Sequence, residues 1–366
     1  MSGTIVVLGA TGYTGRLAVE ALLRRGVRPV LAGRRADELA RLADDLGGLQ
    51  WATADVTDPE SVRTLVGPGD TLLTTVGPFE RFGYLVAEAA ASVGAHYVDS
   101  TGEVGFVREI HRRYDDVARR HGATMLPAFG YDYVPGTLAG ALALAEAPTA
   151  QRLEIGYFAT GSLRNGLSHG TRTTMADGLT LPTTVWRDKH LTDVRTASAV
   201  STFRVRGRRR TGFLVSGTEV LVLPAAHPSL TSVEVYNGWF PALSRAITVT
   251  SALANQLTRR PAGARLVDRI STLATGPAGG PDEAERARTL THAVARATDS
   301  ADNTLSEIHL EGPSIYSLTG ELLALAAQLL DTGAAHLPGV VGPIEAFDLS
   351  VIENECAQIG LRRTTT

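Results

Sequence analysis

The chain has 366 residues, of which 44% are hydrophobic and 20% charged, and its formal net charge is -3. This composition is typical of a globular protein with two domains, and it gives no reason to expect a nucleic-acid or membrane partner. The single cysteine, Cys356, excludes an internal disulfide, and the nine histidines show no zinc-binding spacing, so no metal is expected.

The first predicted elements are a strand, a glycine-rich turn and a helix. Thr4-Ile5-Val6-Val7-Leu8 is a β-branched run typical of a strand buried on both faces. The turn Gly9-Ala10-Thr11-Gly12-Tyr13-Thr14-Gly15 follows, and an amphipathic helix begins near Arg16. Such glycines let the backbone approach a pyrophosphate, to which the helix N-terminus presents N–H groups. The GxxGxxG spacing, a variant of the known fingerprint, predicts a dinucleotide site formed by Gly9, Thr11, Gly12, Tyr13, Thr14 and Gly15.

No secretory signal is expected, because Met1-Ser2-Gly3 leads directly into this strand. The sequence also has no apolar run long enough to span a membrane. We therefore expect a cytoplasmic protein.

The second predicted strand, around residues 30–32, ends in Gly33-Arg34-Arg35. NAD-binding units carry an acidic residue about 20 positions beyond the glycines, where it binds the ribose 2′-hydroxyl. Here that position has two arginines, and guanidinium groups match the geometry of a phosphate. We predict NADP or NADPH as the cofactor, with Arg34 and Arg35 on its 2′-phosphate. The alternative is a pair of solvated arginines at the start of a helix.

Strands and helices continue to alternate up to residue 138, which predicts an α/β fold with a doubly wound parallel sheet of the Rossmann type. Strands are predicted at residues 49–54, 70–76, 96–99 and 123–127, and helices at residues 36–46, 83–93 and 104–121. The loops that follow parallel strands meet at the carboxyl edge of a sheet, where ligands bind. We predict further cofactor contacts there from Asp55, Val56, Val76, Gly77, Pro78, Phe79, Ser100, Thr101 and Gly102.

Three carboxylates near these strand ends could cap backbone N–H groups, and one of them could instead contact the cofactor. Asp55 is predicted either to meet the adenine edge of the cofactor or to cap a short helix that begins near Pro59. Asp99 and Glu103 are interpreted as caps of backbone N–H groups rather than as a catalytic pair.

Candidate catalytic residues follow the sixth predicted strand. Tyr131 or Tyr133 can hydrogen-bond a substrate carbonyl or donate a proton, and Asp132 can orient a tyrosine or bind the nicotinamide amide. The alternative is that Tyr131 packs a hinge and Asp132 tethers a turn. His169, in the polar loop Ser168-His169-Gly170-Thr171-Arg172-Thr173, is a further candidate because it can titrate near neutral pH. A surface loop explains the same composition and is the favoured interpretation.

After residue 138 the alternation stops, which predicts a second, α+β domain on a mixed or antiparallel sheet over residues 139–311. Strands are predicted at residues 152–159, 201–206, 212–223, 230–236 and 304–310, and helices at residues 241–259, 283–297 and 318–330. The run Arg206-Gly207-Arg208-Arg209-Arg210 is predicted to form a basic turn between two strands.

Several motifs together resemble the saccharopine dehydrogenase-like oxidoreductases. They are the Gly9–Gly15 turn, Ala32-Gly33-Arg34, Val76-Gly77-Pro78-Phe79 with Gly83, Tyr97-Val98-Asp99-Ser100-Thr101-Gly102-Glu103, and Gly130-Tyr131-Asp132 with Pro135. The resemblance covers nearly all of residues 1–140 and is greatest to the trans-acting enoyl reductase branch. It implies that the apolar helix near the C-terminus packs on the nucleotide domain. That domain would then be discontinuous, formed by residues 1–138 and 312–366.

The resemblance implies an NADPH-dependent reductase that transfers hydride to a polarised C=C bond of a biosynthetic intermediate. Reduction of a C=N bond, as in saccharopine-type enzymes, is the alternative, and a non-catalytic NADP-binding sensor is another. The substrate is expected to be a small molecule, either free or bound to an acidic carrier protein that docks on Arg206 and Arg208 to Arg210. A homodimer is compatible with the sequence.

Overall fold

The computed structural model describes residues 3–161, 182–239 and 279–365, and in addition Ser244, Ile247, Thr248 and Ser251. The chain forms two compact units. The first comprises Met1–Val134 and Tyr316–Ile359, and the second comprises Pro135–Ile315 and Gly360–Thr366. His169 and most of the helix predicted at residues 241–259 lie outside the described residues.

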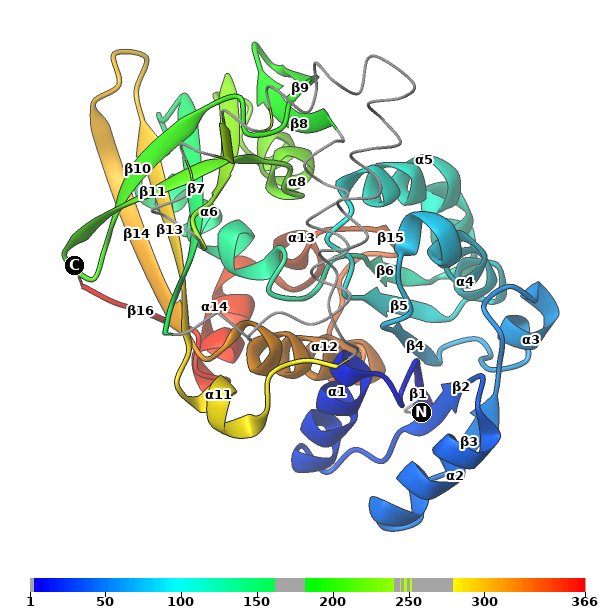
Figure 1. Cartoon of the computed structure of the whole chain (residues 1–366). Coiled ribbons are helices and arrows are strands. Elements are labelled where there is room, and N and C mark those ends of the chain that lie inside the picture. The colour runs from blue at the N-terminus through cyan, green and yellow to red at the C-terminus, as the bar shows by residue number, and fades with distance from the viewer. Residues whose placement is uncertain are drawn as a thin grey trace, which may run out of the picture. The chain divides into compact units, whose positions relative to one another are not determined.

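The first unit is built on a parallel sheet flanked by helices (Figure 1). Its strands are β1 (Ile5–Leu8), β2 (Val30–Gly33), β3 (Trp51–Thr53), β4 (Thr71–Thr74), β5 (His96–Asp99), β6 (Thr124–Leu126) and β15 (Gly339–Val340). Its helices are α1 (Tyr13–Arg24), α2 (Ala36–Asp45), α3 (Pro59–Arg63), α4 (Phe79–Val93), α5 (Val104–His121), α12 (Ile315–Asp331), α13 (Pro343–Phe347) and α14 (Leu349–Gln358). The strand order is β15-β6-β5-β4-β1-β2-β3, with parallel pairing throughout. The predicted doubly wound Rossmann sheet is confirmed.

The core of this unit forms around the central strands β1 and β4, which are buried along their whole length, as expected for a parallel sheet covered on both faces. Helices α4 and α5 pack together through aromatic residues, and the rings of Phe79 and Phe106 lie 5.6 Å apart. Helix α4 begins at Phe79, earlier than predicted, because the Glu103 carboxylate accepts hydrogen bonds from the backbone N–H groups of Phe79 and Glu80. The capping role predicted for Glu103 is therefore confirmed.

The segment after residue 315 completes this unit. Helix α12 packs closely on α1, and a Cβ atom added at Gly320 would lie 3.0 Å from the Cβ of Leu17. An ion pair of 2.8 Å joins Arg24 to Glu321 between the same helices. Strand β15 then pairs with β6 at the edge of the sheet.

The second unit contains a mixed sheet. Its strands are β7 (Arg152–Thr160), β8 (Pro182–Arg187), β9 (His190–Arg195), β10 (Val200–Val205), β11 (Arg208–Val215), β12 (Ser232–Asn237), β13 (Leu290–Thr298), β14 (Thr304–Gly312) and β16 (Arg362–Arg363). Its described helices are α6 (Val134–Glu146), which begins at the boundary, α8 (Glu219–Ala226) and α11 (Glu283–Ala287). The main strand order is β10-β11-β12-β7-β13-β14-β16, and β8 and β9 extend from β12. Strands β7 and β12 are parallel, and the other described pairings are antiparallel, which confirms the predicted mixed sheet.

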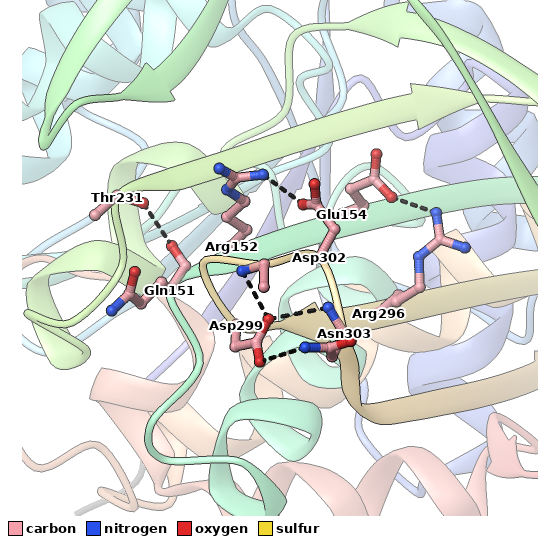
Figure 2. A network of polar contacts seen from close by, with 9 residues as sticks. Gln151, Arg152, Glu154, Thr231, Arg296, Asp299, Asp302 and Asn303 are labelled. Atoms are coloured by element: carbon pink, nitrogen blue, oxygen red, sulfur yellow. Dashed lines mark hydrogen bonds and ion pairs between the residues drawn. The ribbon is translucent and has the colours of Figure 1, made fainter.

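Ion pairs and turn contacts hold the ends of this sheet in register (Figure 2). Arg296 on β13 pairs with Glu154 on the neighbouring β7, and its guanidinium lies 5.2 Å from the ring centroid of Phe203. At the turn between β13 and β14, the Asp299 carboxylate accepts hydrogen bonds from the backbone N–H groups of Ala301 and Asn303, at 2.8 and 2.9 Å. The turn is therefore closed by its own side chains.

Two predicted elements of this unit are wrong in part. The helix predicted at residues 283–297 ends at Ala287, and β13 follows, because pairing with β7 on one side and β14 on the other overrides the helix propensity of its alanines. The strand predicted at residues 212–223 ends at Val215. The apolar residues beyond it form α8, because a short buried apolar run fits a helix as well as a strand.

The predicted basic turn is shorter than expected. Only Arg206 and Gly207 connect β10 to β11, and both have positive φ angles, of 51° and 72°. The other three arginines of the run lie in β11. Among the described residues, no helix is both long and apolar enough to cross a membrane.

Replacing Gly15 tests the closest backbone contact of the first unit. A Cβ at this position would overlap the carbonyl oxygen of Gly9, so Gly15→Ala forces α1 away from β1. We expect the free energy of unfolding, measured with urea, to fall by about 1–3 kcal/mol. Gly67→Ala is the control, because its Cβ would meet nothing nearer than Asp70 Oδ2 at 3.6 Å, and we expect a change below about 0.5 kcal/mol. Equal changes in the two variants would contradict this packing.

Candidate functional site

The glycine turn between β1 and α1 brings the backbone close to the start of the helix. Gly9 has a φ of 89°, in the left-handed region that favours glycine, and Gly12 forms the N-cap of α1. Gly12 donates its N–H to the Gly9 carbonyl at 2.9 Å, and Gly9 donates to the Ala32 carbonyl at 2.9 Å, which ties the turn to β2. Within the described part of the chain, no side chain caps the first turn of α1, and that turn holds no acidic residue. The turn therefore suits an anionic group, as a dinucleotide pyrophosphate requires.

The predicted cofactor residues of this turn lie around the helix start. Thr11, Tyr13 and Thr14 are half-buried. The ring of Tyr13 packs edge-on against Tyr316 of α12, with centroids 5.2 Å apart. This contact fixes the aromatic side chain beside the turn.

The two arginines after β2 differ in their partners. Both are exposed, but Arg35 forms a 2.7 Å ion pair with Glu38, whereas Arg34 has no ion pair within the described ranges. The Arg34 charge also acts on Asp55, which follows β3. Arg34 is therefore the arginine whose guanidinium remains available to a phosphate.

Asp55 closes a local turn of its own. Its carboxylate accepts hydrogen bonds from the N–H and hydroxyl of Thr57, at 2.9 and 2.7 Å, and these bonds lower its pKa, with a smaller contribution from Arg34. Helix α3 is capped instead by Asp58, which accepts the N–H of Glu60 at 3.1 Å. The alternative that Asp55 caps this helix is therefore wrong. Val56 is buried beside it.

The other predicted cofactor residues follow β4 and β5 at the same edge of the sheet. Gly77 and Pro78 are exposed, Val76, Ser100 and Gly102 are half-buried, and Phe79 and Thr101 are buried. The Thr75 hydroxyl lies 3.4 Å from the Gly9 carbonyl oxygen and so joins the loop after β4 to the glycine turn. The structure therefore brings the two loops together.

Asp99 at the end of β5 joins two loops of this edge. Its buried carboxylate accepts hydrogen bonds from the Tyr97 hydroxyl at 2.7 Å and from the N–H groups of Thr101 and Ala128, both at 2.8 Å. Burial raises the pKa of Asp99 to about 6, although these donors oppose the shift. Its predicted capping role is confirmed.

The three candidate catalytic residues that the structure describes lie beside the loop after β5. Tyr131 is 1% exposed, and its backbone N–H donates to Thr319 Oγ1 at 3.2 Å. The Tyr133 hydroxyl donates to the Gly102 carbonyl at 2.9 Å. The Asp132 carboxylate also lies against Gly102, because a Cβ added there would be 3.6 Å from Asp132 Oδ2.

Asp132 differs from the other carboxylates of this edge. It keeps some exposure to solvent, and no hydrogen bond to its carboxylate is found in the described part of the chain. Desolvation alone raises its pKa to about 6. A desolvated carboxyl group without a stabilising partner, at the ligand-binding edge of a sheet, is typical of a functional residue.

The sequence analysis placed the helix near the C-terminus on the nucleotide domain, but it did not predict which residues of α12 contact the candidate site. Tyr316 and Thr319 contact Tyr13 and Tyr131, respectively, from a helix far along the chain. No local pattern marks either residue, because both look like ordinary positions of an apolar helix. Within the described ranges, no group of three or more His, Cys, Asp or Glu side chains has the geometry of a metal site.

Comparison with known proteins shows what the part of the chain that carries this site is similar to. Residues 5–126 match the saccharopine dehydrogenase NADP binding domain. Over 140 residues the chain is 36% identical to proteins named trans-acting enoyl reductase from Mycobacterium ulcerans and Mycobacterium leprae. Each alignment covers 37% of this chain and 34% of the relative, so the chain matches about a third of their length.

The similarity of fold extends further than the similarity of sequence. Saccharopine dehydrogenase (L-Glu forming) from Saccharomyces cerevisiae superposes with a TM-score of 0.64 at 12% identity, over 100% of both chains. At this identity the comparison shows the fold alone.

Neutralising Asp132 tests whether its charge destabilises the folded protein. The raised pKa means that the folded state holds a proton between about pH 4 and 6 that the unfolded state has released, so wild-type stability falls as the pH rises through this window. We expect Asp132→Asn to be more stable than wild type by about 1–3 kcal/mol in urea unfolding at pH 8, with the difference vanishing below pH 4.

Asp116→Asn, which changes an exposed carboxyl group on α5, is the control and should show no such gain. An Asp132→Asn protein that is less stable than wild type at pH 8 would mean that the carboxylate is stabilised in the fold.

Proposed function

We propose that this protein is an NADPH-dependent reductase that transfers hydride to a polarised C=C bond, as an enoyl reductase does. The observation that carries the proposal is the edge where the uncapped turn of α1, the exposed Arg34 and the desolvated Asp132 follow β1, β2 and β6 of one parallel sheet. Its support from relatives is the 36% identity to trans-acting enoyl reductases over 140 residues. The C=C specificity rests on that similarity.

The residues present fit a phosphorylated dinucleotide. The N–H groups of the first turn of α1 would hold the pyrophosphate, next to glycines at which side chains would press on neighbouring protein atoms. The Arg34 guanidinium would bind the 2′-phosphate. Because Arg35 is paired with Glu38, its contribution is expected to be smaller. When bound, NADPH supplies the hydride of the reaction.

Asp132 is our candidate for the group that supplies the proton. Its pKa of about 6 lets it hold a proton more readily than an ordinary carboxyl group at near-neutral pH. Tyr133 is less suited, because its hydroxyl hydrogen bonds to the Gly102 carbonyl. Tyr131 would pack beside Asp132 and support its loop.

In this proposal, Arg34, which follows β2, gives the protein its higher affinity for NADPH than for NADH. We expect Arg34→Gln to weaken NADPH binding about 10- to 100-fold in calorimetric titration, because a charge-assisted contact to the 2′-phosphate is lost. NADH binding should change less than about twofold. Arg41→Gln removes another exposed arginine, one that pairs with Asp37, and should leave both affinities unchanged. An equal loss for both cofactors in Arg34→Gln would remove the role assigned to this residue.

Turnover with a 2-enoyl thioester, followed by NADPH oxidation, tests the reaction itself. We expect kcat of wild type to fall as the pH rises above about 6, because Asp132 must be protonated to act as the donor. Asp132→Asn should lower kcat about 100-fold or more and leave the Kd for NADPH within about twofold.

A mixture of a 2-oxo acid and an amine is the second substrate to assay. Oxidation of NADPH with this mixture alone would assign C=N reduction instead. Binding of NADPH without turnover of either substrate would favour the sensor alternative.

A further inference from the structure

The second unit contains a pocket of about 260 Å³, all of whose lining residues belong to that unit. Its apolar floor is formed by Val205 at the end of β10, Val294 on β13 and Leu310 on β14, each no more than 2% exposed. Arg206 and Thr364 are exposed at its mouth. An apolar floor with a few polar groups at the rim is the usual composition of a small-molecule site.

One carboxylate organises the polar side of the pocket. Glu311 Oε2 lies 3.2 Å from Arg206 Nε and 3.4 Å from His292 Nδ1. His292 is a cross-strand neighbour of Glu311, and its other ring nitrogen lies 3.0 Å from the Thr160 hydroxyl. The imidazole is therefore held on both sides.

Arginine charges act on the polar side of the pocket. Burial lowers the pKa of His292 to about 4, and the charges of Arg206 and Arg210 add to this shift, so the imidazole is neutral at neutral pH. Arg206 and Glu311 are the oppositely charged residues of the lining, and the charge of Arg210 acts on His292 without lining the pocket. The ion-pair partner of Arg206 in the described part of the chain is Glu311, and no hydrogen bond to its terminal nitrogens is found there.

The turn between β10 and β11 fixes Arg206 at the pocket mouth. Its φ of 51° lies in the left-handed region, which a long side chain rarely adopts, and Gly207 follows with a φ of 72°. The guanidinium is held there by its ion pair with Glu311, in which Nε lies 3.2 Å from Oε2. The planar guanidinium fork, exposed at the mouth, matches a carboxylate.

We infer that this pocket binds a small organic carboxylate with a short apolar chain. The carboxylate pairs with the terminal nitrogens of Arg206, and the hydrocarbon chain covers Val205, Val294 and Leu310. Glu311 disfavours ligands of higher negative charge, since a dianion would be repelled by its carboxylate. The inference does not depend on the proposed reductase activity, because it uses no residue of the cofactor site.

Hexanoate is the probe, titrated into the full chain by calorimetry and by ligand-observed NMR. We expect wild type to bind hexanoate at least tenfold more tightly than hexanamide, which has the same chain without the charge. Arg206→Gln should weaken hexanoate binding at least tenfold. Arg209→Gln, which changes an exposed arginine of β11 that does not line the pocket, should bind within twofold of wild type.

Val294→Met changes a residue of the apolar floor and is a second, independent test of the pocket. It keeps the inference testable if Arg206→Gln fails to fold. The longer side chain occupies the pocket, so hexanoate binding should fall at least tenfold while the NADPH affinity stays that of wild type. No binding of hexanoate by wild type, equal binding of hexanamide, or retention of hexanoate binding in Arg206→Gln would each overturn the inference. Failure to bind NADPH would instead count against the proposed function, so the two failures are distinguishable.

Discussion

The close approach of Gly15 to the carbonyl oxygen of Gly9 is the constraint on which the first unit is built. It lets α1 begin directly at the end of β1, so that the positive end of the helix dipole lies at the carboxyl edge of the sheet. Helix α12 then packs against α1 at Gly320. A side chain at Gly15 would displace the helix on which both the anion site and this packing depend.

The carboxylates of the same edge show how structural and functional roles differ physically. Asp99 and Glu103 are satisfied by backbone N–H donors, which fix the loops after β5 and β6 and the start of α4. Asp132 has no such donors within the described ranges and is desolvated. A desolvated carboxylate without donors lowers the stability of the fold. We explain the presence of Asp132 by its role in the proposed reductase reaction.

The sequence predicts the first unit well because its elements have strong local signals. The β-branched run of β1 and the glycines of the following turn each point to one structure. Strand β13 has alanines and an arginine that favour a helix, and only pairing with its two neighbours makes it a strand. Local patterns contain no information about such partners.

Some features of the candidate site could likewise be predicted from local sequence, and others could not. The glycine turn and the arginines after β2 could be predicted, because one short segment supplies each of them. The pairing of Arg35 with Glu38, which leaves Arg34 available, needs side-chain geometry. The contact of Tyr131 with Thr319 joins residues far apart in the chain. Neither feature has a signature in composition or spacing.

Hydrogen–deuterium exchange of the full chain, with and without saturating NADPH, tests most directly whether the first unit holds the cofactor along the carboxyl edge of its sheet. We expect slower exchange in the glycine turn and first turn of α1, at residues 33–35 and at residues 75–79, because bound phosphates would engage or shield these N–H groups. The strands of the second sheet should exchange at unchanged rates. Unchanged exchange in the glycine turn under saturating NADPH would contradict the account.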